Sequence, residues 1–109
     1  MIHVRLYGRP DRIRGFIIWG HARFAPRGRD IVCAGVSAVA TTALIGLHRR
    51  MPGSIRYGIQ PQGLMICRLG EAIPKALAEE AQIILSVMAL GLQSIRNSHA
   101  DFIDISYRR

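Results

Sequence analysis

The chain has 109 residues, of which 50% are hydrophobic and 20% are charged. This length predicts a single domain over residues 1–109 that can bury a core without metals or disulfides, and the composition excludes a disordered chain. The formal net charge is +8, and every basic residue except Lys75 is an arginine. Because these arginines are scattered from Arg5 to Arg109, they favour a solvated surface, while contact with an anionic partner such as ribosomal RNA stays open.

Cysteine usage points to a reducing compartment. Cys33 and Cys67 are the only cysteines, and no C-x-x-C pair or histidine cluster accompanies them. We therefore expect no metal site and no cofactor. Two isolated cysteines in apolar surroundings are typical of reduced thiols, which predicts a cytoplasmic protein, although one disulfide between them stays open. Residues 1–10 lack the apolar core of a secretory signal.

The first elements expected are two strands that form a hairpin. Apolar and polar residues alternate from Ile2 to Tyr7, a Pro-containing turn follows at 8–11, and a second strand is predicted from about Arg14 to Trp19. The end of this strand delivers Gly20 and His21 to one edge of the sheet.

A long helix is expected next. Asp30 is a good N-cap, and the helix should continue to about His48 before Met51-Pro52-Gly53 stops it. The uncharged run 31–47 approaches the length of a membrane span, but its Ser, Thr, Ala and Gly content favours a buried core helix and no membrane contact.

The second half of the chain repeats this order. A second hairpin is predicted from strands at 54–60 and 64–67, and it is followed by a helix from Pro74 to about Asn97 and a final strand at 100–107. The order ββαββαβ predicts an α+β fold, a two-layer sandwich with about five strands and two long helices.

The second helix carries more apolar surface than one sheet face usually covers. One stripe is formed by Leu77, Ala81, Ile84, Met88 and Ile95, and a second stripe beside it by Ile83, Val87 and Leu90. Such a surface indicates self-association, with a thicker monomer core as the alternative.

His21 and Cys33 are the candidate catalytic pair. If Asp30 is the N-cap, Cys33 is the third residue of the helix, where the positive end of the helix dipole favours thiolate. His21 reaches the thiol if the intervening loop folds back over the helix start, and it then acts as base and acid. The amides that begin the helix are candidate donors to an oxyanion.

The residues around this pair resemble a known family. Its signature is similar to Gly20-His21-Ala22 followed by Gly28-Arg29-Asp30-Ile31-Val32-Cys33-Ala34-Gly35-Val36-Ser37. This is the pattern of the ribosomal-processing cysteine protease family, Prp, also described as YsxB-like. The chain departs from the pattern at Gly35, where Ala is usual, and in the arginines of the loop.

The resemblance implies a catalytic dyad of His21 and Cys33 in a small α+β homodimer. The implied substrate is the large-subunit ribosomal protein numbered twenty-seven, which loses an N-terminal extension through an acyl-enzyme. Two alternatives stay open: a phage-type protease of capsid maturation, and a non-enzymatic basic module that binds ribosomal RNA.

Further residues complete the expected site. Asp30 is read as a helix cap or as a group that also orients His21, and Ser37, one turn beyond Cys33, is a supporting residue or a small packing residue. Loop and substrate contacts are expected from Gly20, Ala22, Phe24 and Gly28, with Gly28 as a pivot.

Overall fold

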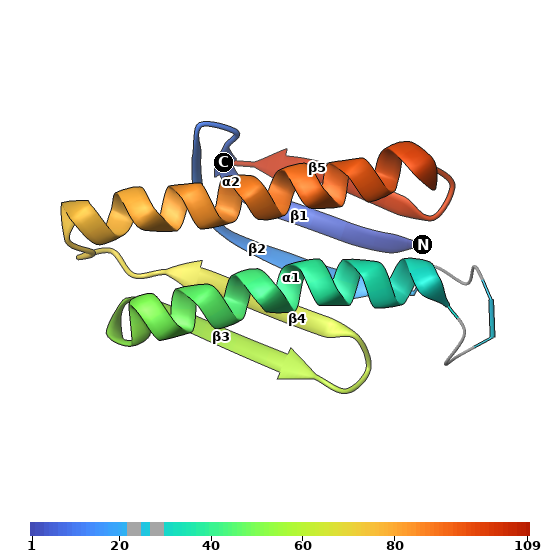
Figure 1. Ribbon diagram of the computed structural model, residues 1–109, viewed down its shortest axis with the longest axis horizontal. Helices are drawn as coiled ribbons and strands as arrows, with labels where there is room; N and C mark the ends of the chain where they lie inside the picture. Colours follow the sequence, from blue (N-terminus) through green and yellow to red (C-terminus); the bar gives the residue numbers. More distant parts are fainter. Residues whose placement is uncertain (22–24, 27–29) are drawn as a thin grey trace.

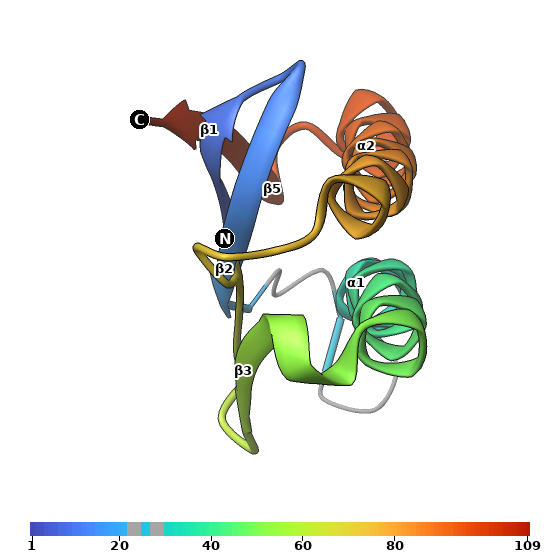
Figure 2. The same cartoon turned by 90° about the vertical axis from the view of Figure 1, so that its left-hand side faces the viewer.

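The computed structural model describes residues 1–21, 25–26 and 30–109. It has two layers, a five-stranded sheet and a pair of helices that lie side by side on one of its faces (Figures 1 and 2). Strands are β1 (Ile2–Arg9), β2 (Arg12–Gly20), β3 (Ile55–Gln60), β4 (Leu64–Leu69) and β5 (Ile103–Arg108), and the helices are α1 (Ile31–Arg50) and α2 (Lys75–Ser98). The predicted α+β fold and its order ββαββαβ are confirmed.

The strands are arranged in the order β3-β4-β2-β1-β5. Both predicted hairpins are present, because β1 pairs with β2 and β3 pairs with β4 in antiparallel fashion. The final strand, β5, pairs in parallel with β1, and β2 pairs with β4 to join the two halves. The sheet is therefore mixed, and the N-terminal strand lies in its interior.

The core lies between the sheet and the helices. Alternation along β1 and β2 turns Val4, Leu6, Phe16 and Ile18 toward the helices, as the period-two pattern predicts. The helices contribute the buried residues Val32, Val36, Leu44 and Leu47 from α1 and Ala81, Leu85, Met88 and Leu92 from α2.

The helices close onto each other through small residues. A Cβ at Gly35 of α1 would lie 3.5 Å from Ile95 Cδ1 of α2, and a Cβ at Gly91 of α2 would lie 3.2 Å from Val39 Cγ1 of α1. Both helices are long and apolar enough to cross a membrane by length and composition alone, but here each packs along its length on the sheet.

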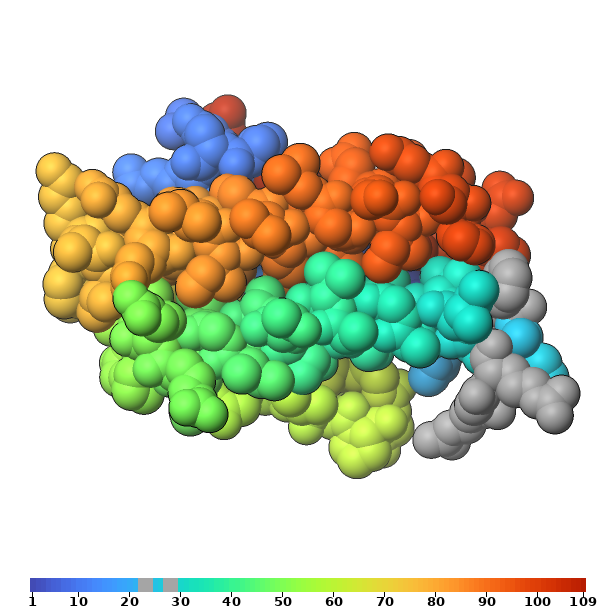
Figure 3. Space-filling view, in the orientation of Figure 1, coloured from blue at the N-terminus to red at the C-terminus, as the bar shows by residue number. Residues whose placement is uncertain are grey.

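The predicted second stripe of α2 is exposed. Ile83, Val87 and Leu90 are 66%, 64% and 70% exposed and face away from the sheet. The helical layer forms the face shown in Figure 3. A thicker monomer core does not account for this stripe, since nothing in the described chain covers it.

Several boundaries differ from the sequence prediction, since β1 extends to Arg9, β2 begins at Arg12 and β4 extends to Leu69. A short 3-10 turn at Pro52–Ser54 leads into β3, so this strand begins one residue later than expected. The last strand begins at Ile103 and not at 100, because a turn brings the amide of Phe102 to the carbonyl oxygen of His99 before β5 joins β1.

Candidate active site

His21 follows the last residue of β2. Gly20 has a φ of +93°, and a Cβ at this position would collide with the carbonyl oxygen of Met1. Only glycine fits such a left-handed conformation at a close backbone approach. Gly20 therefore ends the strand and sets the direction in which His21 leaves the sheet, which gives this predicted loop residue a structural role.

The His21 ring lies against the turn between β3 and β4. A Cβ at Gly63 would be 3.3 Å from His21 Cε1, and Gly63 itself has a φ of +94°. Gly63 was not singled out from the sequence, although its Pro61-Gln62-Gly63 context marks a turn. Because a side chain at this position would press on the imidazole, Gly63 leaves room for the exposed His21.

Cys33 is the third residue of α1, as predicted. Asp30 is the N-cap, and its Oδ1 accepts hydrogen bonds from the amides of Val32 and Cys33, both at 3.0 Å. The Cys33 side chain is partly buried and packs against the core cluster. The start of α1 and the end of β2 lie at the same end of the molecule, so His21 and Cys33 share that end (Figure 1).

The same cap changes one expectation about the helix start. The amides of Val32 and Cys33 already donate to the Asp30 carboxylate, and the amide of Ala34 donates to the Asp30 carbonyl oxygen at 3.1 Å. These three amides were candidate donors to an oxyanion. While Asp30 caps the helix, they are occupied, because each N–H has one hydrogen to donate.

A cavity of about 240 Å³ lies between the start of α1 and the end of α2, and Cys33 is not among the residues that line it. It is walled on the α1 side by Ile31, Val32 and Gly35. The α2 side contributes Ser94, Ile95, Ser98 and the following His99. The cavity thus combines apolar walls with hydroxyl and imidazole groups, and the absence of a side chain at Gly35 widens it.

The structure says little about the role of the remaining predicted site residues. Ser37 is exposed on α1, one turn after Cys33, and its hydroxyl forms no hydrogen bond with another described residue. Ala22, Phe24 and Gly28 lie outside the described residues.

The two cysteines have different surroundings, and neither forms a disulfide. Cys67 in β4 is 2% exposed, and burial raises the pKa of its thiol from 9.0 to about 11. Its predicted place in the core is confirmed. No group of three metal-ligating side chains occurs among residues 1–21, 25–26 and 30–109.

Comparison with known proteins gives one consistent result. A family model described as cysteine protease Prp matches residues 1–104. The chain is 33% identical over 100 residues to the ribosomal processing cysteine protease Prp of Staphylococcus aureus, with 89% of each chain covered. It is also 33% identical over 92 residues to the protein of that name from Bacillus subtilis, covering 82% of this chain and 80% of the relative.

A solved structure agrees in fold as well. The structure of the S. aureus ribosomal processing protease Prp with a covalently linked product peptide superposes with a TM-score of 0.82 at 27% identity. The match covers 99% of this chain and 100% of that one. Taken with the placement of Cys33 at a capped helix start, these similarities show that the chain belongs to the Prp family and is a cysteine protease.

Proposed function

We propose that this protease removes the N-terminal extension of the large-subunit ribosomal protein numbered twenty-seven. The observation that carries the proposal is similarity over nearly the whole chain to relatives named as ribosomal processing proteases. The S. aureus relative holds a covalently linked product peptide, which fits a reaction through an acyl-enzyme.

In this proposal Cys33 is the nucleophile and His21 is its base. The sequence offers two cysteines, and burial of Cys67 with a pKa near 11 makes it unsuitable at neutral pH. Cys33 lies in the first turn of a 20-residue helix, where the macrodipole favours a negative charge. His21 is exposed at the same end of the molecule and is held beside the β3–β4 turn.

The proposed reaction proceeds in two steps, acylation of Cys33 and hydrolysis of the thioester. His21 takes the thiol proton of Cys33 while the sulfur adds to the peptide carbonyl; the C–N bond then breaks, and the leaving amine receives that proton. In the second step His21 takes a proton from water and the hydroxide adds to the thioester; the C–S bond then breaks to release the carboxylic acid product, and His21 returns the proton to the Cys33 sulfur. Asp30 holds the helix start throughout, so an oxyanion donor other than the amides of residues 32–34 is required.

We also propose that the protease is a cytoplasmic homodimer. The exposed stripe of Ile83, Val87 and Leu90 on α2 supports an interface in the helical layer. The absence of a disulfide between Cys33 and Cys67 fits a reducing compartment. Contact with ribosomal RNA is a separate proposal, for which the surface is derived below.

The decisive experiment is cleavage of a peptide that carries the N-terminal segment of the host's own ribosomal protein. Products are weighed by mass spectrometry for the wild type, Cys33→Ala, His21→Ala and the matched cysteine control Cys67→Ala. We expect cleavage by the wild type and the control, none by Cys33→Ala, and a rate lower by a factor of about 10² to 10⁴ for His21→Ala.

Two results would decide against the proposal. Cleavage that survives Cys33→Ala excludes this residue as the nucleophile. An intact ribosomal peptide, together with cleavage of a phage capsid protein by the same enzyme, would instead favour the capsid-maturation alternative.

A further inference from the structure

The face of the sheet opposite the helices is open. No described element covers it, as the view along the layers shows (Figure 2). The strand register turns an arginine of β1, β3, β4 and β5 toward this face, and Arg14 of β2 stands at a register shift, where it lines the same cavity as Arg68. None of these arginines forms an ion pair with a described residue. These open-face arginines are Arg5 of β1, Arg14 of β2, Arg56 of β3, Arg68 of β4 and Arg108 of β5.

Negative charge on this face is sparse. The only carboxylate at an outward strand position is Asp104 of β5, whose Oδ2 lies 3.5 Å from His3 Nδ1. The face therefore carries a strong excess of positive charge in a chain whose net charge is +8. An anionic partner is favoured here by charge complementarity.

Three planar groups are stacked at the end of the sheet near His21. The ring of His3 lies 5.0 Å from the ring of Trp19 at an interplanar angle of 22°, and the Arg5 guanidinium carbon lies 5.1 Å from the Trp19 ring centroid. The His3 side chain keeps 38% of its surface exposed. A nucleobase can extend such a cluster, because bases stack on aromatic rings and on guanidinium planes.

No hydrogen bond or ion pair joins the Arg5 guanidinium to another described residue. Its Nε is buried and has no hydrogen-bond partner among the described residues. The guanidinium is thus positioned by its contact with Trp19 and not by a carboxylate. An arginine held in this way is pre-oriented, and its accessible N–H groups remain available for a phosphate.

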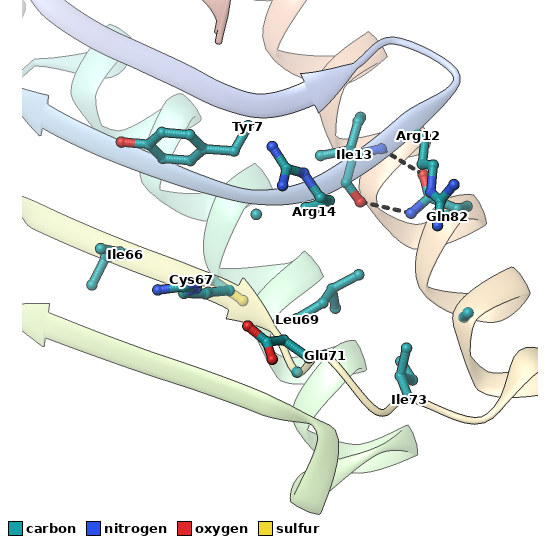
Figure 4. A pocket seen from close by; sticks show the side chains of 14 residues that line it. Tyr7, Arg12, Ile13, Arg14, Ile66, Cys67, Leu69, Glu71, Ile73 and Gln82 are labelled. Carbon is teal, nitrogen blue, oxygen red and sulfur yellow. Dashed lines mark hydrogen bonds between the residues drawn. The ribbon is translucent and has the colours of Figure 1, made fainter. Parts of the chain in front are cut away.

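A cavity of about 580 Å³ continues this face at the other end of β2 (Figure 4). It opens where the pairing of β2 with β4 stops at Gly15 and Arg68, and there Gln82 of α2 substitutes for a strand. Ile13 N donates to Gln82 Oε1 at 2.8 Å, and Gln82 Nε2 donates to Ile13 O at 2.6 Å. Arg12, Arg14, Tyr7 and Arg68 line the cavity, with Glu71 as its carboxylate.

We propose that the open face binds single-stranded RNA, with bases stacked at the His3–Trp19–Arg5 cluster and phosphates held by the open-face arginines. Trp19 and Gly15 are four residues apart on β2, about 13 Å at the rise of a strand, so one short strand of RNA reaches from the cluster to the cavity. Duplex RNA fits less well, because its bases are stacked inside the helix. An acidic peptide matches the charge but has no base to stack.

The test uses the 109-residue protein with Cys33→Ala and a fluorescently labelled single-stranded RNA of ten nucleotides. Anisotropy gives the affinity, and because Trp19 is the only tryptophan in the sequence, its fluorescence reports stacking directly. We expect Trp19 quenching on binding, a loss of at least about fivefold in affinity for Trp19→Ala, and substantial rescue by Trp19→Phe.

Charge variants distinguish RNA binding at the open face from a general effect of the net charge. Arg68→Glu on the open face should weaken binding, whereas Arg49→Glu at the end of α1, which changes the net charge equally, should not. Glu71→Gln should strengthen binding, since it removes a carboxylate from the cavity. Circular dichroism measures whether each variant is folded. If Trp19→Ala does not fold, Trp19→Phe and the charge variants test the proposal in its place.

Three outcomes overturn the proposal: equal weakening by Arg68→Glu and Arg49→Glu, displacement of RNA by polyglutamate of equal charge concentration, and a change in oligomeric mass for Arg68→Glu. The proposal is independent of cleavage. Arg68→Glu should still cleave the ribosomal peptide, and RNA binding that persists in an enzyme with no peptide activity would sink the proposed substrate alone.

Discussion

Asp30 is the residue whose role the structure defines most closely. Its carboxylate accepts from two amides of the first turn, so Asp30→Ala should lower the free energy of unfolding by about 1 kcal/mol. Asp30→Asn keeps an oxygen acceptor, so it should lower the free energy of unfolding by only a few tenths of that amount. Urea denaturation measures both values.

The same pair of variants separates capping from catalysis. If Asp30 acts only as a cap, Asp30→Asn should cleave peptide at close to the wild-type rate. A folded and stable Asp30→Asn variant that has lost cleavage would show instead that the carboxylate orients His21.

The two thiols should differ sharply in reactivity. Cys67 is buried, and its pKa of about 11 keeps it protonated at pH 7 to 9, so only Cys33 should react with iodoacetamide in the native protein. Reaction at Cys67 should increase only as the pH approaches 11 or when the protein unfolds. Peptide mapping by mass spectrometry after timed alkylation gives both rates, and equal rates at pH 7 contradict the assignment.

Among the elements, the stability of the contact between α1 and α2 depends on the positions of its glycines. Gly35→Ala gains helix propensity, and its new methyl group meets Ile95 at an ordinary 3.5 Å, so stability should rise by up to about 1 kcal/mol. Gly91→Ala gains the same propensity, but its methyl group meets Val39 at 3.2 Å. Thermal unfolding should therefore rank Gly35→Ala above Gly91→Ala, and equal gains would contradict this account of the helix contact.

Elements built from local pattern were predicted well, and pairings between distant strands were not. The alternation of Ile2, Val4 and Leu6 predicts β1 and its buried face because period two matches the pleat. Nothing local indicates that β5 lies parallel to β1, since that pairing depends on the path of α2 across the sheet. The apolar stripe of α2 was predicted without Leu85 and Leu92, which the packing against the sheet buries fully.

For the whole molecule, the proposed homodimer makes a simple prediction. Val87→Lys with Leu90→Lys places two charges on the exposed stripe of α2, and because both residues are exposed in the monomer, folding should be retained. The mass measured by light scattering should fall from dimer to monomer. Ile59→Lys on β3, exposed to 55%, is the control and should stay dimeric. A monomeric wild type excludes the interface.

The sequence by itself determined the element order, the two hairpins, the Asp30 cap and the family, because these depend on local periodicity, on capping chemistry and on a contiguous motif around Cys33. Only the tertiary structure decided what surrounds that motif. It placed His21 against Gly63, occupied the helix-start amides with Asp30, and gathered arginines of β1, β3, β4 and β5 on one face, with Arg14 at the register shift of β2. Such features join residues far apart in the chain, and their contacts exist only once the strands are paired and the helices packed.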